Sequence, residues 1–166
     1  MKKKRRLSHL DRGGSPRMVD VSGKLVTSRT ATAEAWVRIA PKTARALRAS
    51  GGLAKGNVLE TARLAGVLAA KRTPELIPLC HPLLIDAIEV EAALVGSLVR
   101  IVARVACQGK TGVEMEAMTA ASVAALTVYD MVKSADKGIQ IGPVRLLEKT
   151  GGKSGEWRRE DRDGRC

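Results

Sequence analysis

Residues 114–134, EMEAMTAASVAALTVYDMVKS, form the clearest helical segment of the chain and constrain how the rest can pack around it. At 100° per residue its apolar side chains gather on one side, and we expect this stripe to face the core. The stripe comprises Met118, Ala121, Ala125, Val128, Tyr129 and Val132. A second, semi-polar stripe is a surface that a ligand or a partner subunit could approach, and it comprises Glu116, Thr119, Ala120, Val123, Thr127 and Asp130. Thr111 and Glu114 have the spacing of a capping box, which predicts the start of this helix.

A predicted hairpin precedes this helix, and a single predicted strand follows it. Residues 84–94 and 97–107 are dominated by aliphatic and β-branched side chains, and Gly96 between them marks a turn. This pattern is typical of two long antiparallel strands joined directly. A last strand is expected near residues 139–147, ahead of a glycine-rich loop.

The N-terminal half predicts one strand and two helices. Residues 33–39 alternate enough to form a strand, and Pro41 suits the first turn of a short helix reaching about residue 49. Asn57 and Glu60 have the spacing of an N-cap and a capping-box acid, so a second helix should run to about residue 72, where Pro74 stops it. Small residues on one face of that helix predict tight packing against a sheet: Ala62, Ala65, Gly66 and Ala69.

The resulting order is strand, helix, helix, strand, strand, helix, strand, within one domain of residues 1–166. Helices packed on one face of an antiparallel sheet, an α+β fold, are the natural arrangement for this order. The chain has no Phe, one Tyr and two Trp, so Ala, Val, Leu and Ile must fill the core. Residues 1–16 and 158–166 are expected to be flexible tails.

The net charge of +12 favours anionic partners, although residues 2–6, KKKRR, supply five of the positive charges in one terminal run. A nucleic-acid-binding module is therefore the main rival from another functional class, and its binding would weaken steeply with salt. The near absence of aromatic side chains on which bases could stack argues against that rival.

The cysteines and the hydropathy predict a cytoplasmic protein without a membrane-spanning segment. Cys80, Cys107 and Cys166 form neither a paired framework nor a CxxC motif, which is typical of a reducing compartment. The first residues lack an apolar segment of the signal-peptide type, and no apolar run approaches the length of a transmembrane helix.

Two glycine-rich segments, GKTG at 109–112 and GGKSG at 151–155, could present backbone N–H groups and a lysine to phosphate. A P-loop would need a further glycine five residues before each Gly-Lys pair, and Arg104 and Leu147 stand there instead. The alternative is that both are ordinary turns, and the sequence leaves the two interpretations open.

His81 lies in a loop, residues 76–82, that prolines bracket. A rigid turn suits a catalytic histidine, but a histidine hydrogen-bonded into its own loop is an equally good interpretation. A zinc site is not expected, because no spaced set of His and Cys would complete a tetrahedron.

Charged residues at both ends of the helix 114–134 are further candidates. Glu114 and Glu116 lie where acids favour a helix start for structural reasons alone. Asp130 interrupts an apolar run and should lie half-buried about 40° from Glu116 on one face, with Lys133 one turn beyond to pair with it. Such a pair could be structural, or it could tune a proton-transfer lysine. Lys55 precedes a capped helix, and is either part of an anion site or a surface lysine.

Several ordered motifs over about residues 7–157 resemble one family. They are MVDVS at 18–22, KGNV at 55–58, AAKRT at 69–73, LIPLCHP at 76–82, GKTGVEMEA at 109–117, residues 120–133, IGPVRLL at 141–147 and GGKSG at 151–155. The chain is similar in these motifs to the cyclic pyranopterin monophosphate synthases of molybdenum-cofactor biosynthesis.

The resemblance implies a ferredoxin-like α+β fold in a homohexamer, a trimer of dimers with active sites at subunit interfaces. It implies a lyase that converts 3′,8-cyclo-7,8-dihydroguanosine 5′-triphosphate to cyclic pyranopterin monophosphate and releases pyrophosphate, without metal or other cofactor. A degenerate relative that serves only as an oligomeric scaffold is the alternative, and the presence of every matched Lys, His and acid argues against it.

The resemblance also gives expected roles to matched residues. Lys55 and Lys133 would be the main catalytic lysines, with Asp130 tuning Lys133. Glu114 and Glu116 would hold the guanine-derived rings or shuttle protons. The expected substrate-binding residues are Cys80, His81, Met115, Arg29, Lys71 and Lys149, of which His81, Arg29, Lys71 and Lys149 would bind the triphosphate. Arg17 stands where many relatives have a histidine, which is the one departure from the pattern.

Overall fold

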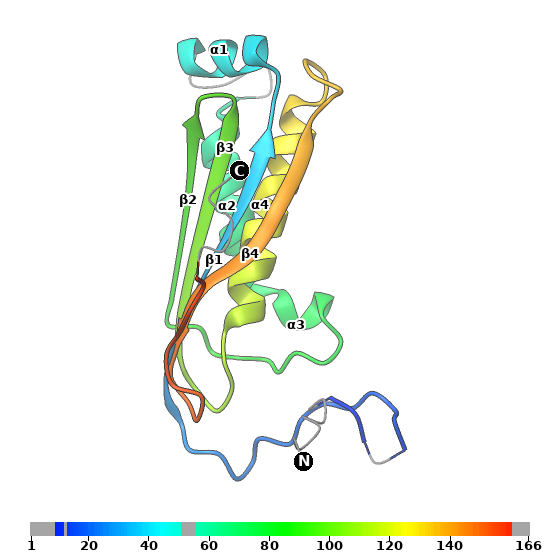
Figure 1. Cartoon of the computed structure of the whole chain (residues 1–166), viewed down its shortest axis with the longest axis vertical. Coiled ribbons are helices and arrows are strands. Elements are labelled where there is room, and N and C mark those ends of the chain that lie inside the picture. Colours follow the sequence, from blue (N-terminus) through cyan, green and yellow to red (C-terminus); the bar gives the residue numbers. More distant parts are fainter. Residues whose placement is uncertain (1–8, 12, 51–55, 161–166) are drawn as a thin grey trace.

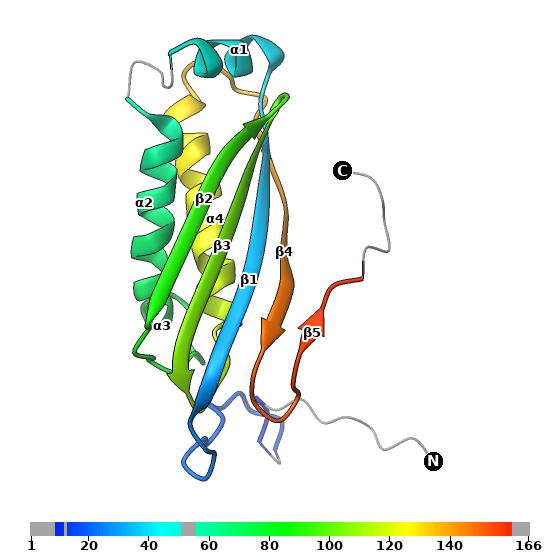
Figure 2. The same cartoon turned by 90° about the vertical axis from the view of Figure 1, so that its left-hand side faces the viewer.

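A computed structural model describes residues 9–11, 13–50 and 56–160 of the chain. Its strands form one antiparallel sheet in the order β2-β3-β1-β4-β5, and the helices α2 and α4 cover one face of this sheet (Figures 1 and 2). The strands are β1 Thr27–Arg38, β2 Ala87–Val95, β3 Leu98–Gly109, β4 Gln140–Thr150 and β5 Trp157–Arg158. The predicted α+β fold is confirmed, and the order of β1 to β4 is that of a ferredoxin-like sheet.

The helices are α1 Pro41–Ser50, α2 Val58–Lys71, α3 Thr73–Leu76 and α4 Glu114–Val132. α1 lies at one end of the sheet and α3 at the other (Figure 1). We call the α3 end basal and the α1 end distal. α4 starts at the basal end and finishes at the distal end, whereas α2 runs the opposite way (Figure 2). In the described ranges no helix combines the length and apolar character needed to cross a membrane.

Most predicted elements are present, and the differences have local causes. α1, α2, the hairpin and the last strand are confirmed within three residues. β1 begins six residues earlier than predicted, because its first half, TSRTAT at 27–32, has a single apolar residue and so no alternating apolar pattern. Pro74 lies in the first turn of the short helix α3. A proline is tolerated there because N–H groups in the first turn have no partner within the helix.

The strand β5 was not predicted, because residues 157–160 carry no alternating apolar pattern. Trp157 pairs with Lys149 across β4, and the Arg159 amide donates to the Leu147 carbonyl at 2.7 Å. Residues 157–159 therefore lie on the sheet edge, at the start of the segment for which a tail is expected. The flexibility expected for residues 1–8 and 161–166 concerns positions outside the described residues.

The core is built from small aliphatic residues, as the composition predicted. The small face of α2 is confirmed at Ala62, Gly66 and Ala69, which are buried, while Ala65 is half-buried. A Cβ at Gly66 would lie 3.1 Å from both the Ala120 carbonyl oxygen and a Val90 methyl group. Glycine thus lets α2 approach α4 and the sheet together.

The predicted core stripe of α4 is partly wrong. Tyr129 is exposed and Met118 is half-buried, whereas Ala117, Ala120 and Ala124 are fully buried. α4 packs against both the sheet and the neighbouring helix α2, so its buried face is wider than the one-sided stripe that periodicity predicts. Thr119 and Ala120 of the predicted semi-polar stripe are therefore part of the interior.

The predicted capping box of α4 is also wrong. Val113 occupies the N-cap position, and no side chain caps this helix. Glu114 pairs with Lys149 instead. At α2 the predicted N-cap is confirmed, since Asn57 Oδ1 accepts from the Glu60 amide at 3.1 Å, but the Glu60 carboxylate pairs with Arg63.

The sheet face opposite the helices carries a buried acid. Glu34 on β1 is 2% exposed, and its two carboxylate oxygens accept from Arg145 Nε at 2.8 Å and Arg100 Nε at 3.0 Å. The Arg100 guanidinium also lies 5.5 Å from the centre of the Trp36 ring. This charged network stabilises the open face of the sheet.

Candidate active site

The basal end brings together chain segments that are far apart in sequence. The start of β1, the end of β3, the first turn of α4 and the loop after β4 enclose a cavity of about 370 Å³. We call it the basal pocket. Glu114 is the one acid among the residues that line it. The lining also includes five cationic side chains, Lys24, Arg29, Lys110, Lys149 and Lys153.

The two glycine-rich segments meet at this pocket around Arg29. Arg29 Nε donates to the Gly109 carbonyl at 3.3 Å. A Cβ at Gly152, whose φ is +71°, would collide with Arg29 Nη1, so glycine lets the guanidinium lie against the second loop. Both loops thus contribute lysines to one pocket, which supports the phosphate interpretation over that of separate turns.

Glu114 is held by an ion pair within the pocket. Its Oε1 lies 2.6 Å from Lys149 Nζ, and both side chains are about 30% exposed. Glu114 in the first turn of α4 therefore meets Lys149 on β4, which pairs one predicted acid with one predicted phosphate-binding lysine.

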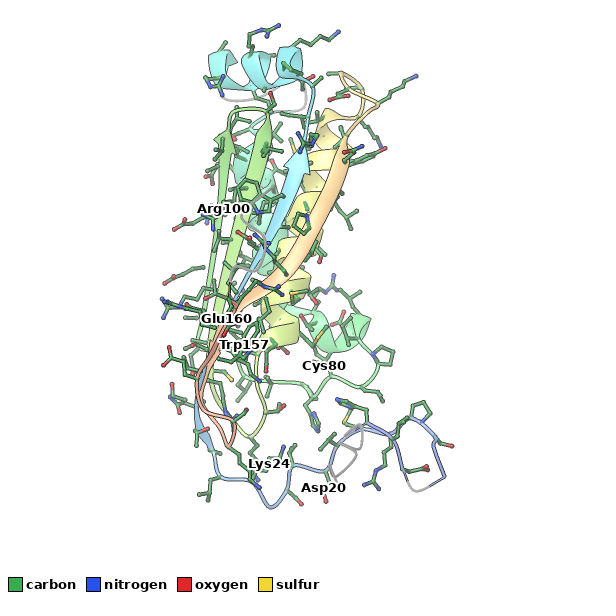
Figure 3. All side chains as sticks on the ribbon, viewed as in Figure 1. Asp20, Lys24, Cys80, Arg100, Trp157 and Glu160 are labelled. Carbon is green, nitrogen blue, oxygen red and sulfur yellow. The ribbon has the colours of Figure 1, made fainter. Side chains whose placement is uncertain are left out.

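The segment 13–26, which we call the N-terminal arm, crosses the basal end, with Asp20 and Lys24 beyond the end of the sheet (Figure 3). His81 Nε2 lies 2.8 Å from the Val19 carbonyl oxygen, and Lys110 Nζ donates to the Ser22 carbonyl at 2.9 Å. Because a carbonyl only accepts, Nε2 of His81 is the donor in this contact. His81 is therefore hydrogen-bonded to this arm rather than to its own loop.

Glu116 is almost completely enclosed. Its side chain is 1% exposed, Cys80 Sγ lies 3.4 Å from Oε1, and Oε2 has no hydrogen-bond partner among the described residues. Burial raises the pKa of Glu116, and the nearby Glu114 charge adds to this, while its own N–H and the Cys80 thiol oppose it. Burial and Glu116 raise the pKa of Cys80 to about 12, so Cys80 remains a thiol.

Asp130 and Lys133 lie at the distal end of α4. They pair at 2.6 Å as predicted, but Asp130 is 59% and Lys133 52% exposed, so the half-buried position expected for Asp130 is wrong. The hydrogen bond and charge of Asp130 raise the pKa of Lys133, which keeps the ammonium group protonated. At about 1.5 Å per residue, the 19-residue helix separates Lys133 from Glu114 by about 28 Å.

The remaining predicted residues are Lys71, Met115 and Lys55. Lys71 is exposed at the basal end of α2, and Met115 is 40% exposed in the first turn of α4. Lys55 lies outside the described residues, and Asn57, two positions later, caps the distal end of α2. Across residues 9–11, 13–50 and 56–160, no three His, Cys, Asp or Glu side chains cluster as a metal site.

Sequence reasoning did not place Lys24, Lys110 and Lys153 among the site residues. The flanking glycines of Lys110 and Lys153 were the available signal, since they mark loops that can hold phosphate. Lys24 has no such signal, because only the path of the N-terminal arm brings it to the pocket.

Comparisons with known proteins agree with the arrangement of motifs. The model of the MoaC family matches residues 18–152. The cyclic pyranopterin monophosphate synthase of Methylobacterium sp. (strain 4-46) is 59% identical over 155 residues, which cover 91% of this chain and 95% of the relative. The proteins of the same name from Streptomyces avermitilis and Parvibaculum lavamentivorans are each 55% identical, over 93% of this chain and 90% and 97% of their own lengths.

Proposed function

This chain belongs to the MoaC family, and on that premise we propose that it is a cyclic pyranopterin monophosphate synthase of molybdenum-cofactor biosynthesis. The substrate is 3′,8-cyclo-7,8-dihydroguanosine 5′-triphosphate. A ribose-derived hydroxyl attacks the α-phosphorus as pyrophosphate leaves, while the guanine-derived rings are opened and rebuilt. These steps need charge neutralisation on phosphate and several proton transfers.

The basal pocket is the observation that carries this proposal. Five cationic side chains and two glycine-rich loops suit a triphosphate, whose oxygens accept from ammonium, guanidinium and backbone N–H groups. Arg29 and Lys149 are the predicted phosphate ligands inside the pocket, and Lys71 lies exposed at the same end of the molecule. Lys24, Lys110 and Lys153 extend that set.

The acids next to the pocket provide proton-transfer groups. Glu116 sits in an environment that favours its neutral form and can give up a proton, whereas Glu114 is paired with Lys149 and can accept one. His81 is held by the N-terminal arm through Nε2, and Met115 presents an exposed side chain in the first turn of α4. The Cys80 thiol contacts Glu116 Oε1 at 3.4 Å.

The separation along α4 supports a site shared between subunits. Along the helix axis Lys133 lies about 28 Å and Asp130 about 24 Å from Glu114, too far for one substrate to reach both ends within one subunit. We propose a homohexamer, a trimer of dimers, in which the distal end of one α4 meets the basal end of a partner. Lys55, from the segment before α2, would join Lys133 in that shared site. We place the enzyme in the cytoplasm, from the biosynthetic role of its relatives.

The direct test supplies the purified protein with the cyclised GTP intermediate and follows pyrophosphate release and pterin formation. Lys133→Ala is expected to lower turnover by at least about 10² while the oligomer stays intact, because a general acid or base contributes about that much. Lys137→Ala is the matched control, since Lys137 is also an exposed lysine just after α4.

Each contrary outcome has its own meaning. Near-normal turnover by Lys133→Ala would refute the role of Lys133. No turnover by the correctly assembled parent protein would refute the enzymatic function, and the oligomeric scaffold would then be the better interpretation.

A mixing experiment tests the shared site. Lys133→Ala and Glu116→Gln proteins are unfolded together and refolded, so that mixed dimers form. A mixed dimer has one site with both defects and one with neither, so about a quarter of parental turnover should return. Sites contained within single subunits would give no recovery.

A further inference from the structure

The contact between Cys80 and Glu116 joins a loop residue to the first turn of α4. The Cys80 thiol donates to Glu116 Oε1 at 3.4 Å and also approaches the His81 carbonyl at 3.8 Å. Glu116 is 1% exposed, and the other oxygen, Oε2, has no hydrogen-bond partner in the part of the chain that the structure describes. A buried carboxyl oxygen without a partner is costly, and its retention needs an explanation.

Other roles for this thiol do not fit its surroundings. A nucleophile or metal ligand must be a thiolate, and the raised pKa of about 12 keeps Cys80 protonated. The described residues contain no His, Cys, Asp or Glu cluster that would hold a metal with it, and Cys80 and Cys107 are both unbridged. Hydrogen-bond donation is the chemistry left to this thiol.

We propose that Cys80 is a positioning residue: its S–H group donates to Glu116 Oε1 and thereby leaves Oε2 as the oxygen that carries the acid proton. This inference rests on the proposed function, and it gives Cys80 a role through Glu116 in place of direct substrate contact. A thiol suits the task because it is a weak donor, which orients the carboxyl group without strongly stabilising its anion.

Glu114 shows the contrast two residues earlier in the same turn. Lys149 pairs with the Glu114 carboxylate, its Nζ lying 2.6 Å from Oε1. Glu116 has a thiol in the corresponding place and a raised pKa. The two acids of one helical turn thus have different partners, a lysine and a thiol.

The titratable groups around Glu116 come from several elements. Cys80 approaches from the loop before β2, Cys107 from β3 and Glu114 from α4 itself. Lys149 on β4 acts on Glu114, and Arg29 on β1 acts on Cys107. A pH effect assigned to the Cys80–Glu116 pair must therefore disappear when either member is replaced.

The first test measures the thiol and needs no turnover. Alkylation of Cys80 by iodoacetamide is followed against pH by mass spectrometry of the assembled protein. Glu116→Gln should raise the rate near pH 9, because burial and the Glu116 charge both raise the thiol pKa and the variant removes the charge. Glu114→Gln, the control, should raise it less. An unchanged rate in Glu116→Gln would overturn the proposal whether or not the protein is an enzyme.

The second test measures turnover and its pH profile. Cys80→Val fills the space without a donor, so kcat should fall about tenfold with little change in KM, and the limb due to Glu116 should move to higher pH. Cys80→Ser keeps a donor and should restore most of kcat. Equal losses in both variants with no movement of the limb would show that Cys80 only fills space and would overturn the proposal. If Cys80→Val fails to fold, the alkylation result decides.

Discussion

Two buried glutamates on opposite faces of the sheet have nearly the same exposure and opposite surroundings. Glu34 is 2% exposed on the open face, and both of its oxygens accept from arginines. Burial alone would raise its pKa, but the hydrogen bonds from Arg145 and Arg100 outweigh burial and hold the pKa below its ordinary value. Glu116, in the first turn of α4, is 1% exposed. Its Oε1 accepts from the Cys80 thiol, and its pKa is raised.

The difference separates an acid that stabilises the fold from one kept for chemistry. Removing a partner from a satisfied buried ion pair leaves an uncompensated charge, which is strongly destabilising. Removing the charge of a carboxyl group with an unpartnered oxygen relieves a cost instead. Stability and turnover measurements on the two residues should therefore give opposite results.

The largest expected effect is the contrast between stability and turnover when either glutamate is replaced by glutamine. Glu34→Gln should lower the free energy of unfolding by about 3 kcal/mol, because Arg100 and Arg145 lose their counter-charge. Glu116→Gln should change it by less than about 1 kcal/mol yet lower kcat by at least about 10². Urea unfolding and the pyrophosphate assay measure the two quantities. A loss of stability in Glu116→Gln equal to that in Glu34→Gln would contradict the distinction.

The arginines on Glu34 should differ in a smaller but ordered way. Arg145 is 25% exposed and Arg100 is 43% exposed, so water replaces the Arg145 interaction less well. Arg145→Ala should cost about 2 kcal/mol and Arg100→Ala about 1 kcal/mol in unfolding free energy. The reverse order in urea titrations would show that the contact of Arg100 with Trp36 outweighs the ion pair.

The smallest expected effect is on the pH dependence of stability, and it has opposite signs for the two acids. Below the ordinary value of 4.5, folded Glu34 is ionised while the unfolded chain binds a proton, so its contribution is present above that pH and lost as pH falls. Above 4.5, folded Glu116 keeps its proton while the unfolded chain loses it, so its contribution falls as pH rises toward its raised pKa.

Each slope is at most about 1.4 kcal/mol per pH unit for one group. Unfolding free energies of the parent and the two glutamine variants, measured from about pH 3 to about pH 8, isolate each contribution by difference. Difference curves of the same sign would contradict the assignments.

Sequence predicted the parts of this molecule that local patterns specify. Asn57 signals the start of α2 through its own side chain, and Gly96 signals the hairpin turn, so both were placed correctly. For the glycine-flanked lysines the sequence leaves phosphate loops and ordinary turns open, and the structure places both lysines in the lining of one pocket. These features depend on residues within a few positions of one another.

The errors arise where distant partners or neighbouring layers decide the outcome. Glu114 was assigned to a capping box because its partner Lys149, 35 residues away, cannot be read from local spacing. The arginines on Glu34 are 66 and 111 residues from it and meet it only through strand register. On α4, alanines give little contrast between faces, so the exposure of Asp130 and Tyr129 could not be distinguished from burial.

The two tryptophans have a practical consequence for spectroscopy. Trp36 lies beside Arg100 on the open face of the sheet, and Trp157 lies on the edge strand β5, so neither is in the alanine-rich core between sheet and helices. The wavelength of their fluorescence maximum depends on the polarity around each indole ring. It therefore monitors that face and that edge of the sheet. Single Trp→Tyr variants would assign the signal, and a fluorophore introduced on α2 would be needed to watch the helical layer.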